Sequence, residues 1–214
     1  MKKQKVDWYF DFISPFAYFQ YCALSTIKQQ RPGLIIKYHP VLFAGLLKHH
    51  QHKGPAEIPA KRRMTYRYCH WYAKKNALDF SFPAAHPFNP LPMLRLTIAT
   101  GCDENTVSLL FKHTWVDSAS NSDFFSIAAL AQIPGLENTA EQVAQPEVKD
   151  QLQRNTTAAI EQGIFGVPTL AIGEQLFWGL DMTEMAMAYL DNPAVFEGDE
   201  YKRIHDLPVA MTRL

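Results

Sequence analysis

The sequence predicts an α/β fold in which a mostly helical block interrupts the sheet. Three observations predict it. Residues 6–12 and 34–39 are aromatic or β-branched and flank one helical segment, which is typical of a β-α-β unit with parallel strands. Residues 44–132 show almost no strand-like alternation of apolar and polar side chains. Two short strand-like segments, 169–172 and 175–178, follow near the C-terminus.

The helix after the first strand has a clear start signal. Ser14 is a favourable N-cap, and Pro15 is a favourable first helical residue. Apolar side chains then recur at helical spacing until Arg31-Pro32-Gly33 interrupts the pattern. We therefore expect a helix over residues 15–30.

The interrupting block is expected to contain helices only. Helical periodicity predicts helices over residues 59–75, 92–100 and 104–116, and a shorter one over 126–132. Residues 82–92 are rich in proline and predict a loop.

The C-terminal part returns to alternating helices and strands. We expect a helix over residues 146–162 and a tight hairpin at Gly173-Glu174. A last helix is expected over 181–189, where Asp181 could act as the cap. The tail from residue 191 is polar with scattered prolines, and we expect it to wrap over the surface.

Without the helical block, the predicted order is β-α-β-α-β-β-α, the order of a thioredoxin-type domain. We therefore predict a discontinuous thioredoxin-like domain over residues 1–43 and 146–191. The helical insertion would occupy residues 44–145, and a C-terminal tail would occupy 192–214.

Composition excludes several classes of partner. Lysine plus arginine and aspartate plus glutamate number 21 each, so no net charge favours nucleic acid or an anionic membrane. We expect no signal peptide, and no apolar run approaches the roughly 20 residues that span a bilayer. The cysteines form no C-x-x-C pair, which favours buried thiols in a reducing compartment, the cytoplasm. They are Cys22, Cys69 and Cys102.

The turn around Ser14 is the first segment with chemical potential. Backbone N–H groups are unpaired at a helix N-terminus, and the helix dipole favours negative charge there. In thiol oxidoreductases of this fold the same turn carries C-x-x-C, whereas here it reads Ser14-Pro15-Phe16-Ala17, so dithiol–disulfide exchange is excluded at this turn. The remaining hydroxyl suits a thiolate brought by a cofactor. Lowering a thiol pKa by about two units requires roughly 2.7 kcal/mol, which one charged hydrogen bond and the helix end can supply. A simple N-cap is the alternative.

Two later segments could complete a binding site. A cis Val167-Pro168 bond would leave the Val167 N–H and C=O free to pair with an extended peptide, such as the cysteinyl part of glutathione. An ordinary trans proline at the start of a strand is the alternative. The carboxylate of Asp181 could bind a ligand amine, or could serve only as a helix cap.

Three adjacent or nearly adjacent histidines could suggest a metal site. They point in different directions on a helix and have no acidic partner at a ligand spacing, so we expect a solvated helix end and no metal. They are His49, His50 and His52.

Four segments together indicate a family. They are YFDFISPFAY near the N-terminus, PAEIPAKRRMTY at 55–66, FPAAHPFNPLPMLR at 82–95, and GIFGVPTLAIGEQLFWGLD at 163–181. With them the chain resembles the 2-hydroxychromene-2-carboxylate isomerases and their relatives, the kappa-class glutathione transferases. The two middle segments point towards the isomerase branch.

The resemblance implies a DsbA-like thioredoxin fold with an all-helical insertion, glutathione as cofactor, and a homodimer. The family's thiol-activating serine falls on Ser14, its cis-proline pair on Val167-Pro168, and its γ-glutamyl-binding aspartate on Asp181. A glutathione-contacting lysine falls on Lys61, and His52 stands where the family has an asparagine.

The implied reaction is a glutathione-dependent isomerisation. Ser14 would stabilise the glutathione thiolate, which adds transiently to an aromatic 2-oxo acid, allows rotation about a former double bond, and leaves again unconsumed. The small aromatic carboxylate substrate would need cation or amide donors, for which the candidates are Lys48, Asn89 and Arg95. Two alternatives stay open, a kappa-class-like glutathione transferase and a catalytically inactive thioredoxin-fold binding protein.

Overall fold

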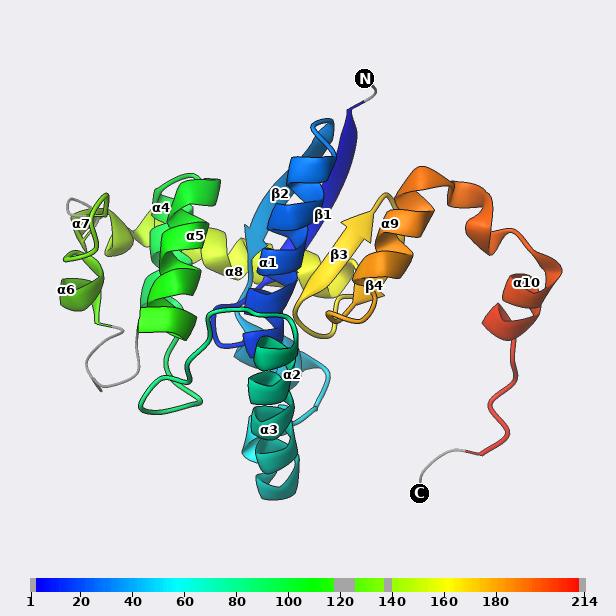
Figure 1. Ribbon diagram of the computed structural model, residues 1–214, viewed down its shortest axis with the longest axis horizontal. Helices are drawn as coiled ribbons and strands as arrows, with labels where there is room; N and C mark the ends of the chain where they lie inside the picture. Colours follow the sequence, from blue (N-terminus) through cyan, green and yellow to red (C-terminus); the bar gives the residue numbers. More distant parts are fainter. Residues whose placement is uncertain (1–2, 118–125, 137–139, 212–214) are drawn as a thin grey trace.

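A four-stranded mixed sheet forms the centre of the protein, in the order β2-β1-β3-β4 (Figure 1). The computed structural model describes residues 3–117, 126–136 and 140–211. The strands are β1 (Gln4–Phe10), β2 (Leu34–Pro40), β3 (Thr169–Ile172) and β4 (Gln175–Trp178).

The strand directions decide which loops meet. β1 and β2 are parallel, as the predicted crossover requires, while β3 is antiparallel to β1 and forms a hairpin with β4. In this pairing Tyr9 lies opposite Thr169. The chain just after β1 and the chain just before β3 therefore lie at the same edge of the sheet.

β1 has the predicted length, but it starts and ends two residues earlier than predicted. The expected strand over residues 6–12 ends at Phe10, because the chain turns at Asp11. The Asp11 carboxylate accepts a hydrogen bond from the Ile13 N–H, which closes that turn locally.

Each face of the sheet has its own helices. Val6, Trp8 and Phe10 of β1 are buried in one cluster with side chains of α1 (Pro15–Gln30) and α9 (Thr183–Asp191). Tyr9 points to the opposite face. There the helices are α2 (Phe43–His49) and α8 (Pro146–Glu161), and α8 passes behind the strands in Figure 1. This alternation follows from the two-residue period of a strand.

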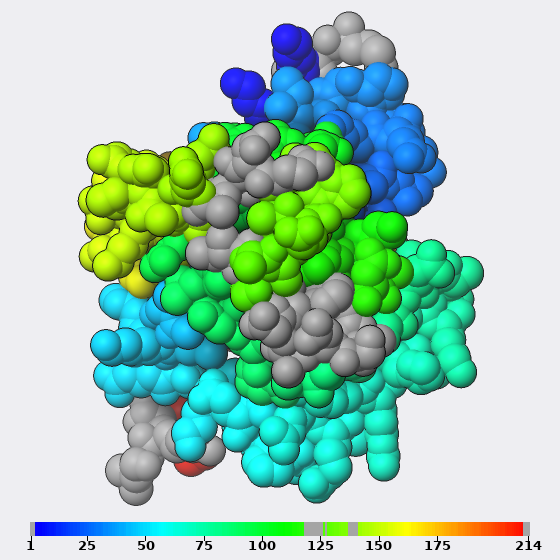
Figure 2. All heavy atoms as spheres, turned by 90° about the vertical axis from the view of Figure 1, so that its left-hand side faces the viewer, coloured from blue at the N-terminus to red at the C-terminus, as the bar shows by residue number. Residues whose placement is uncertain are grey.

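The segment between β2 and α8 contains helices and, within the described residues, no strand, as predicted. Figure 1 shows α3 standing apart from the group α4–α7, and Figure 2 shows that group covering the side of the molecule that faces the viewer there. The helices after α2 are α3 (Pro59–Lys75), α4 (Leu91–Ala99), α5 (Glu104–Lys112), α6 (Ile127–Leu130) and α7 (Ala140–Val143), and a 3-10 turn, Pro55–Glu57, precedes α3.

The helix expected over residues 104–116 is a regular α-helix only as far as Lys112. It then widens into a π-helical turn, His113–Asp117. In this turn Trp115 lies with its indole N–H on the carbonyl oxygen of Phe12, 3.0 Å away. Such π-helical turns are rare and are often found at functional sites.

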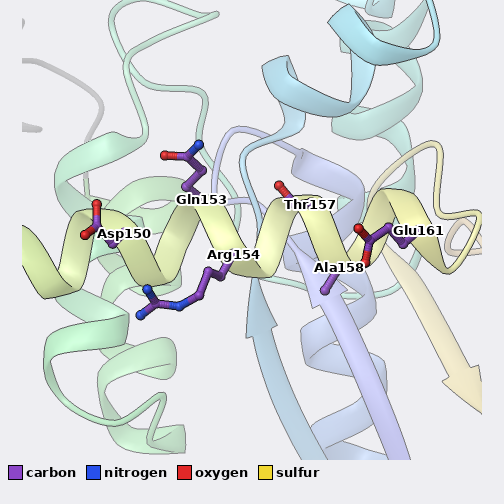
Figure 3. Close-up of a pocket in the computed structure, with 6 residues that line it drawn as sticks. All are labelled: Asp150, Gln153, Arg154, Thr157, Ala158 and Glu161. Carbon is purple, nitrogen blue, oxygen red and sulfur yellow. The ribbon is translucent and has the colours of Figure 1, made fainter.

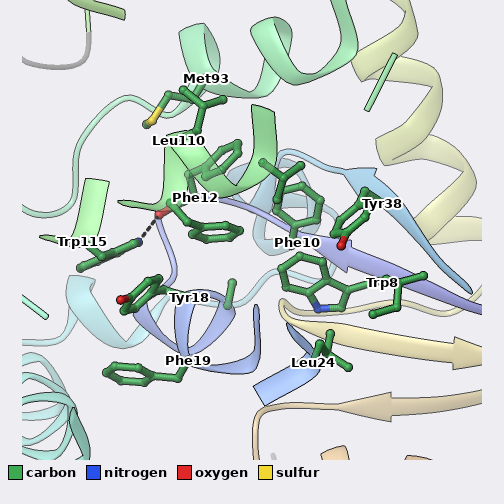
Figure 4. Close-up of a cluster of buried hydrophobic side chains, with 14 of the residues drawn as sticks. Trp8, Phe10, Phe12, Tyr18, Phe19, Leu24, Tyr38, Met93, Leu110 and Trp115 are labelled. Carbon is green, nitrogen blue, oxygen red and sulfur yellow. Dashed lines mark hydrogen bonds between the residues drawn. The ribbon is translucent and has the colours of Figure 1, made fainter. Parts of the chain in front are cut away.

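One aromatic core joins the sheet to the inserted helices. The rings of Trp8 and Phe10 stack at 4.5 Å (Figure 4). The ring of Phe111 in α5 lies 4.7 Å from that of Phe12. All four side chains are fully buried. The predicted boundaries at residues 44 and 146 stay a prediction, because the core is continuous across them.

The C-terminal tail has more structure than expected. It forms a 3-10 turn, Pro193–Phe196, and a short helix α10 (Asp199–His205), which stands away from the sheet instead of wrapping over it (Figure 1). All residues of α10 are exposed, and its Tyr201 ring lies 5.1 Å from the ring of Phe196 in the preceding turn. Among the described residues, no helix has the length and apolar character needed to cross a bilayer.

Candidate active site

Ser14 caps helix α1, as predicted. Its backbone is extended, with φ −93° and ψ 115°, and its Oγ accepts a hydrogen bond from the Ala17 N–H at 3.3 Å. Since the oxygen already accepts from the helix, the hydroxyl proton is available to a ligand, and no acceptor for it is found in the described part of the chain. The residue is 8% exposed. The cap is thus observed, while the role towards a thiolate stays a prediction.

Asp11 is a buried acid in the same turn. It is fully buried, and its carboxylate accepts a hydrogen bond from the Ile13 N–H at 3.1 Å. It accepts a second one, at 2.9 Å, from the N–H of Phe43, which is the first residue of α2. Burial raises the pKa of the Asp11 carboxyl to about 7, although these N–H groups oppose the rise. Sequence reasoning missed this residue. The available signal was an acidic side chain directly after a strand and three residues before Ser14.

Two side chains of the helical insertion hold the carbonyl groups of this turn. The Trp115 indole N–H donates to the Phe12 oxygen, and the His86 Nε2 lies 2.8 Å from the Ile13 oxygen. Burial lowers the pKa of His86. Neither contact was predicted, because each joins residues far apart in the sequence. Together they bind the turn before Ser14 to the insertion.

The Val167-Pro168 bond is cis, as the second motif allowed. The Pro168 carbonyl accepts from the Gly179 N–H at 2.8 Å, which leaves β3 attached to the turn after β4. The N–H and C=O of Val167 make no hydrogen bond within the described residues. Because β3 is antiparallel to β1, these two free groups and Ser14 lie at the same edge of the sheet.

A buried amide connects α1 to the turn before α9. The Gln20 side chain is fully buried, and its Oε1 accepts from the Trp8 indole N–H at 2.7 Å. Its Nε2 donates to the Gly179 oxygen and to the Thr183 hydroxyl, both at 2.9 Å. The turn that carries Asp181 is therefore fixed relative to the helix that Ser14 caps.

Asp181 is not the cap of the last helix, so that interpretation is wrong. α9 begins at Thr183 with Met182 at the N-cap position, and no side chain caps it. The reason is the turn at Gly179, whose φ of 98° delays the helix start. The exposed Asp181 carboxylate folds back over Gly179 so closely that a Cβ there would lie 2.5 Å from its Oδ1. This leaves the carboxylate free of a capping role.

The other predicted ligand residues are more dispersed. Lys61 is exposed in the first turn of α3, Lys48 is exposed in the last turn of α2, and His52 is exposed in the segment that follows α2. Asn89 is exposed, and its Oδ1 accepts from the Leu91 N–H at the start of α4. Arg95 is half-buried, and its Nε is buried without a partner in the described part of the chain. No contact among the described residues joins any of these five to Ser14, so their roles stay predictions.

Two hollows lie elsewhere, and Ser14 lines neither. One, of about 430 Å³, runs along the exposed face of α8 (Figure 3). All six residues that line it belong to this one helix, among them Asp150, Arg154 and Glu161. The other, of about 710 Å³, lies between β4, α9 and α10 and is lined by apolar side chains such as Phe165, Trp178 and Tyr201.

A family model covers most of the chain. The model of the DSBA-like thioredoxin domain matches residues 5–191. The chain belongs to the DsbA-like thioredoxin family. Within this DsbA-like protein, the turn that starts α1 carries Ser14 and Ala17 and no cysteine, and the three cysteines are free thiols elsewhere in the fold.

Curated relatives of this DsbA-like protein are enzymes. It is 28% identical to the 2-hydroxychromene-2-carboxylate isomerase of Sphingobium xenophagum over 191 residues, which cover 86% of this chain and 97% of the relative. It is 22% identical to glutathione S-transferase kappa 1 of Caenorhabditis elegans over 214 residues, which cover 90% of this chain and 93% of the relative. The family resemblance predicted from the sequence is confirmed, and with it the prediction of an enzyme.

A solved structure agrees with the fold. The structure of selenomethionine 2-hydroxychromene-2-carboxylate isomerase superposes with a TM-score of 0.76 and 23% identity, covering 92% of this chain and all of the other. The predicted DsbA-like thioredoxin fold is confirmed, and the helices between β2 and α8 agree with a helical insertion.

Proposed function

We propose that the protein is a glutathione-dependent isomerase of the 2-hydroxychromene-2-carboxylate isomerase type. The observation that carries the proposal is the Ser14 hydroxyl at the N-terminus of α1, which accepts from the helix and keeps its own proton free. The free backbone groups of Val167 lie at the same sheet edge. An anion with an attached extended peptide matches both features, and glutathione has both parts.

The residues of this edge would divide the binding of glutathione among them. The backbone of Val167 would pair with the cysteinyl unit, beside Pro168, and the carboxylate of Asp181 would pair with the γ-glutamyl amine. Lys61 and His52 would bind carboxylate or carbonyl groups at the other end. The fit is supported by the unpaired Val167 groups and by the absence of a capping role for Asp181.

Glutathione, when bound, supplies a thiolate that can add to a conjugated double bond of the substrate and leave again. The Ser14 hydroxyl donates its hydrogen bond to the sulfur and so favours the thiolate over the thiol. The N-terminus of α1 adds its dipole in the same direction. Ser14 itself forms no bond to the substrate, because its proton stays on Oγ.

The substrate would be a small aromatic 2-oxo acid, a proposal supported by relatives that are named for 2-hydroxychromene-2-carboxylate, a small aromatic carboxylate. Lys48, Asn89 and Arg95 are the proposed partners of its carboxylate, and the buried unpaired Nε of Arg95 is the feature that supports that residue. We further propose a homodimer that works in the cytoplasm, where free cysteines such as these persist.

A kappa-class-like glutathione transferase is the second candidate, and the match to the Caenorhabditis elegans transferase favours it. The two activities differ in their use of glutathione. An isomerase regenerates glutathione at each turnover, whereas a transferase consumes one molecule for each product molecule. Counting free thiol during turnover separates them.

The test is Ser14→Ala, with Ser14→Thr as the matched control that keeps a hydroxyl and a helix cap. The pKa of enzyme-bound glutathione is measured from the ultraviolet absorbance of the thiolate. We expect Ser14→Ala to raise this pKa by about one to two units, since a hydrogen bond to a charged group contributes about 1.5–3 kcal/mol. Isomerase activity should fall about 10- to 100-fold. An unchanged thiol pKa in Ser14→Ala contradicts the proposal.

A further inference from the structure

A chain of hydrogen bonds runs from α3 to the turn beside Ser14. The Tyr66 hydroxyl lies 2.7 Å from the Nδ1 of His86, and the Nε2 of His86 lies 2.8 Å from the carbonyl oxygen of Ile13. Tyr66 and His86 belong to the helical insertion, whereas Ile13 directly precedes the helix cap. The function proposed above gives these two side chains no task.

The chemistry of the acceptor fixes the tautomer of His86. A carbonyl oxygen can only accept, so the Nε2 of His86 must carry the proton that is donated to Ile13. In the neutral ring Nδ1 is then an acceptor, and the Tyr66 hydroxyl donates to it. Tyr66 thereby selects the form of His86 that can hold Ile13.

The contact to Ile13 persists when His86 gains a proton. The Tyr66 oxygen lies 2.9 Å from the carbonyl oxygen of His86, so the hydroxyl has a second acceptor available. In a protonated ring Nδ1–H donates to Tyr66, and Tyr66 donates to that carbonyl group. Both states leave Nε2–H on the Ile13 oxygen.

Packing also holds the His86 ring in place. Its centroid lies 5.6 Å from the ring of Trp115, 5.8 Å from that of Phe88 and 5.4 Å from that of Tyr66. A ring enclosed on several sides loses little further entropy when it forms the bond to Ile13.

We propose that His86, oriented by Tyr66, is a positioning residue for Ser14. Its Nε2–H fixes the Ile13 carbonyl and so fixes the peptide that leads into the N-cap, where Ser14 has φ −93° and ψ 115°. The direction of the Ser14 hydroxyl depends on that backbone geometry. This inference rests on the proposed role of Ser14 towards a thiolate.

The partial negative charge of the Ile13 carbonyl oxygen also affects the stability of a thiolate at Ser14. Without its donor, this oxygen would be an unpaired acceptor next to the place where a thiolate is to be stabilised, and it would disfavour the anion. With His86 in place, the partial charge of the Ile13 oxygen is offset by the fixed Nε2–H dipole of His86. The bond therefore contributes both order and favourable electrostatics to the site.

Three variants test the inference. His86→Leu removes the donor at similar volume, and His86→Gln keeps a side-chain N–H at a comparable reach. Tyr66→Phe removes only the hydroxyl that orients the ring. For each variant we measure the pKa of bound glutathione from thiolate absorbance, kcat and KM for the isomerase reaction, and the free energy of unfolding.

We expect His86→Leu to raise the bound-thiol pKa by about one unit and to lower kcat about tenfold, with a KM for glutathione within about threefold of the wild type. His86→Gln should restore most of the loss, and Tyr66→Phe should give a smaller shift in the same direction. A loss of stability at an unchanged thiol pKa, or equal values for the leucine and glutamine variants, overturns the inference.

The outcomes also separate this inference from the proposed function. If the wild-type protein does not lower the thiol pKa of glutathione, the proposed function and the positioning role are both refuted. A different result refutes only the positioning role. In that result the wild type lowers the thiol pKa of glutathione, Ser14→Ala abolishes this effect, and the three variants behave like the wild type. Should His86→Leu fail to fold, Tyr66→Phe and His86→Gln still decide the question.

Discussion

The Gln20 network offers a sharp test of what holds the site together. Replacing Gln20 with leucine keeps a side chain of similar size in a fully buried position, so no large cavity forms. The change removes three hydrogen bonds, to Trp8, Gly179 and Thr183. Thr183 keeps its bond to the Leu180 oxygen, but the indole N–H of Trp8 and the carbonyl group of Gly179 lose these partners.

The expected cost follows from those two orphaned groups. A buried donor or acceptor left unsatisfied costs about 1–3 kcal/mol, which applies in full to the fully buried Trp8 indole and only in part to the half-buried Gly179 carbonyl, so Gln20→Leu should lower the free energy of unfolding by about 1–4 kcal/mol. That is a large part of the roughly 5–15 kcal/mol that a typical domain has in total. The turn carrying Asp181 should also loosen, which predicts weaker glutathione binding.

The assay is equilibrium unfolding in urea, followed by tryptophan fluorescence and circular dichroism. Gln29→Leu is the matched control, because Gln29 is exposed on the same helix and its replacement should change the free energy of unfolding by no more than about 0.5 kcal/mol. If Gln20→Leu proves as stable as Gln29→Leu, the reasoning about buried polar groups at this site is wrong.

Three further predictions concern Asp11, Phe111 and Gly179. Because the pKa of Asp11 is raised to about 7 in the folded state, the folded protein binds this proton more tightly, and stability should fall between about pH 4 and pH 7. Asp11→Asn should flatten that part of the curve, and an equally steep fall in the variant would contradict it. Phe111→Ala should lower the free energy of unfolding, measured in urea, by about 3–5 kcal/mol. Phe165 is 40% exposed, so Phe165→Ala should lower it by about 1 kcal/mol or less, and equal losses would rule out the shared aromatic core. Gly179→Ala must displace the Asp181 carboxylate, so glutathione titration should show weaker binding, and unchanged affinity would argue against a role for Asp181.

Local signals carried the prediction of the fold and of Ser14. The serine-proline pair at a helix start and the parallel strands around α1 depend on neighbouring residues, and the structure has both. The prediction that Asp181 caps the last helix was wrong because the cap position depends on the positive φ of Gly179, which the sequence pattern does not show. The end of β1 was placed two residues late for a similar reason, the turn at Asp11.

Contacts between distant segments could not be predicted. His86 meets Ile13 and Trp115 meets Phe12 across 73 and 103 residues of chain, and no local pattern shows which carbonyl groups need a partner. Trp115 was included in a predicted regular helix, but the widened π-helical turn that carries it is a tertiary feature. Sequence reasoning therefore predicted the Ser14 hydroxyl and missed His86 and Trp115, the side chains that hold the turn before it.

The position of β1 between β2 and β3 has a consequence for the protein while it is being made on the ribosome. The partner on one side, β2, follows within a few dozen residues, but the partner on the other side is synthesised only after the entire insertion. At about 5–20 residues per second, one edge of this central strand waits on the order of ten seconds for β3. During that interval the open edge can pair with other nascent chains, so a chaperone that covers extended apolar segments would raise the yield of correctly assembled protein.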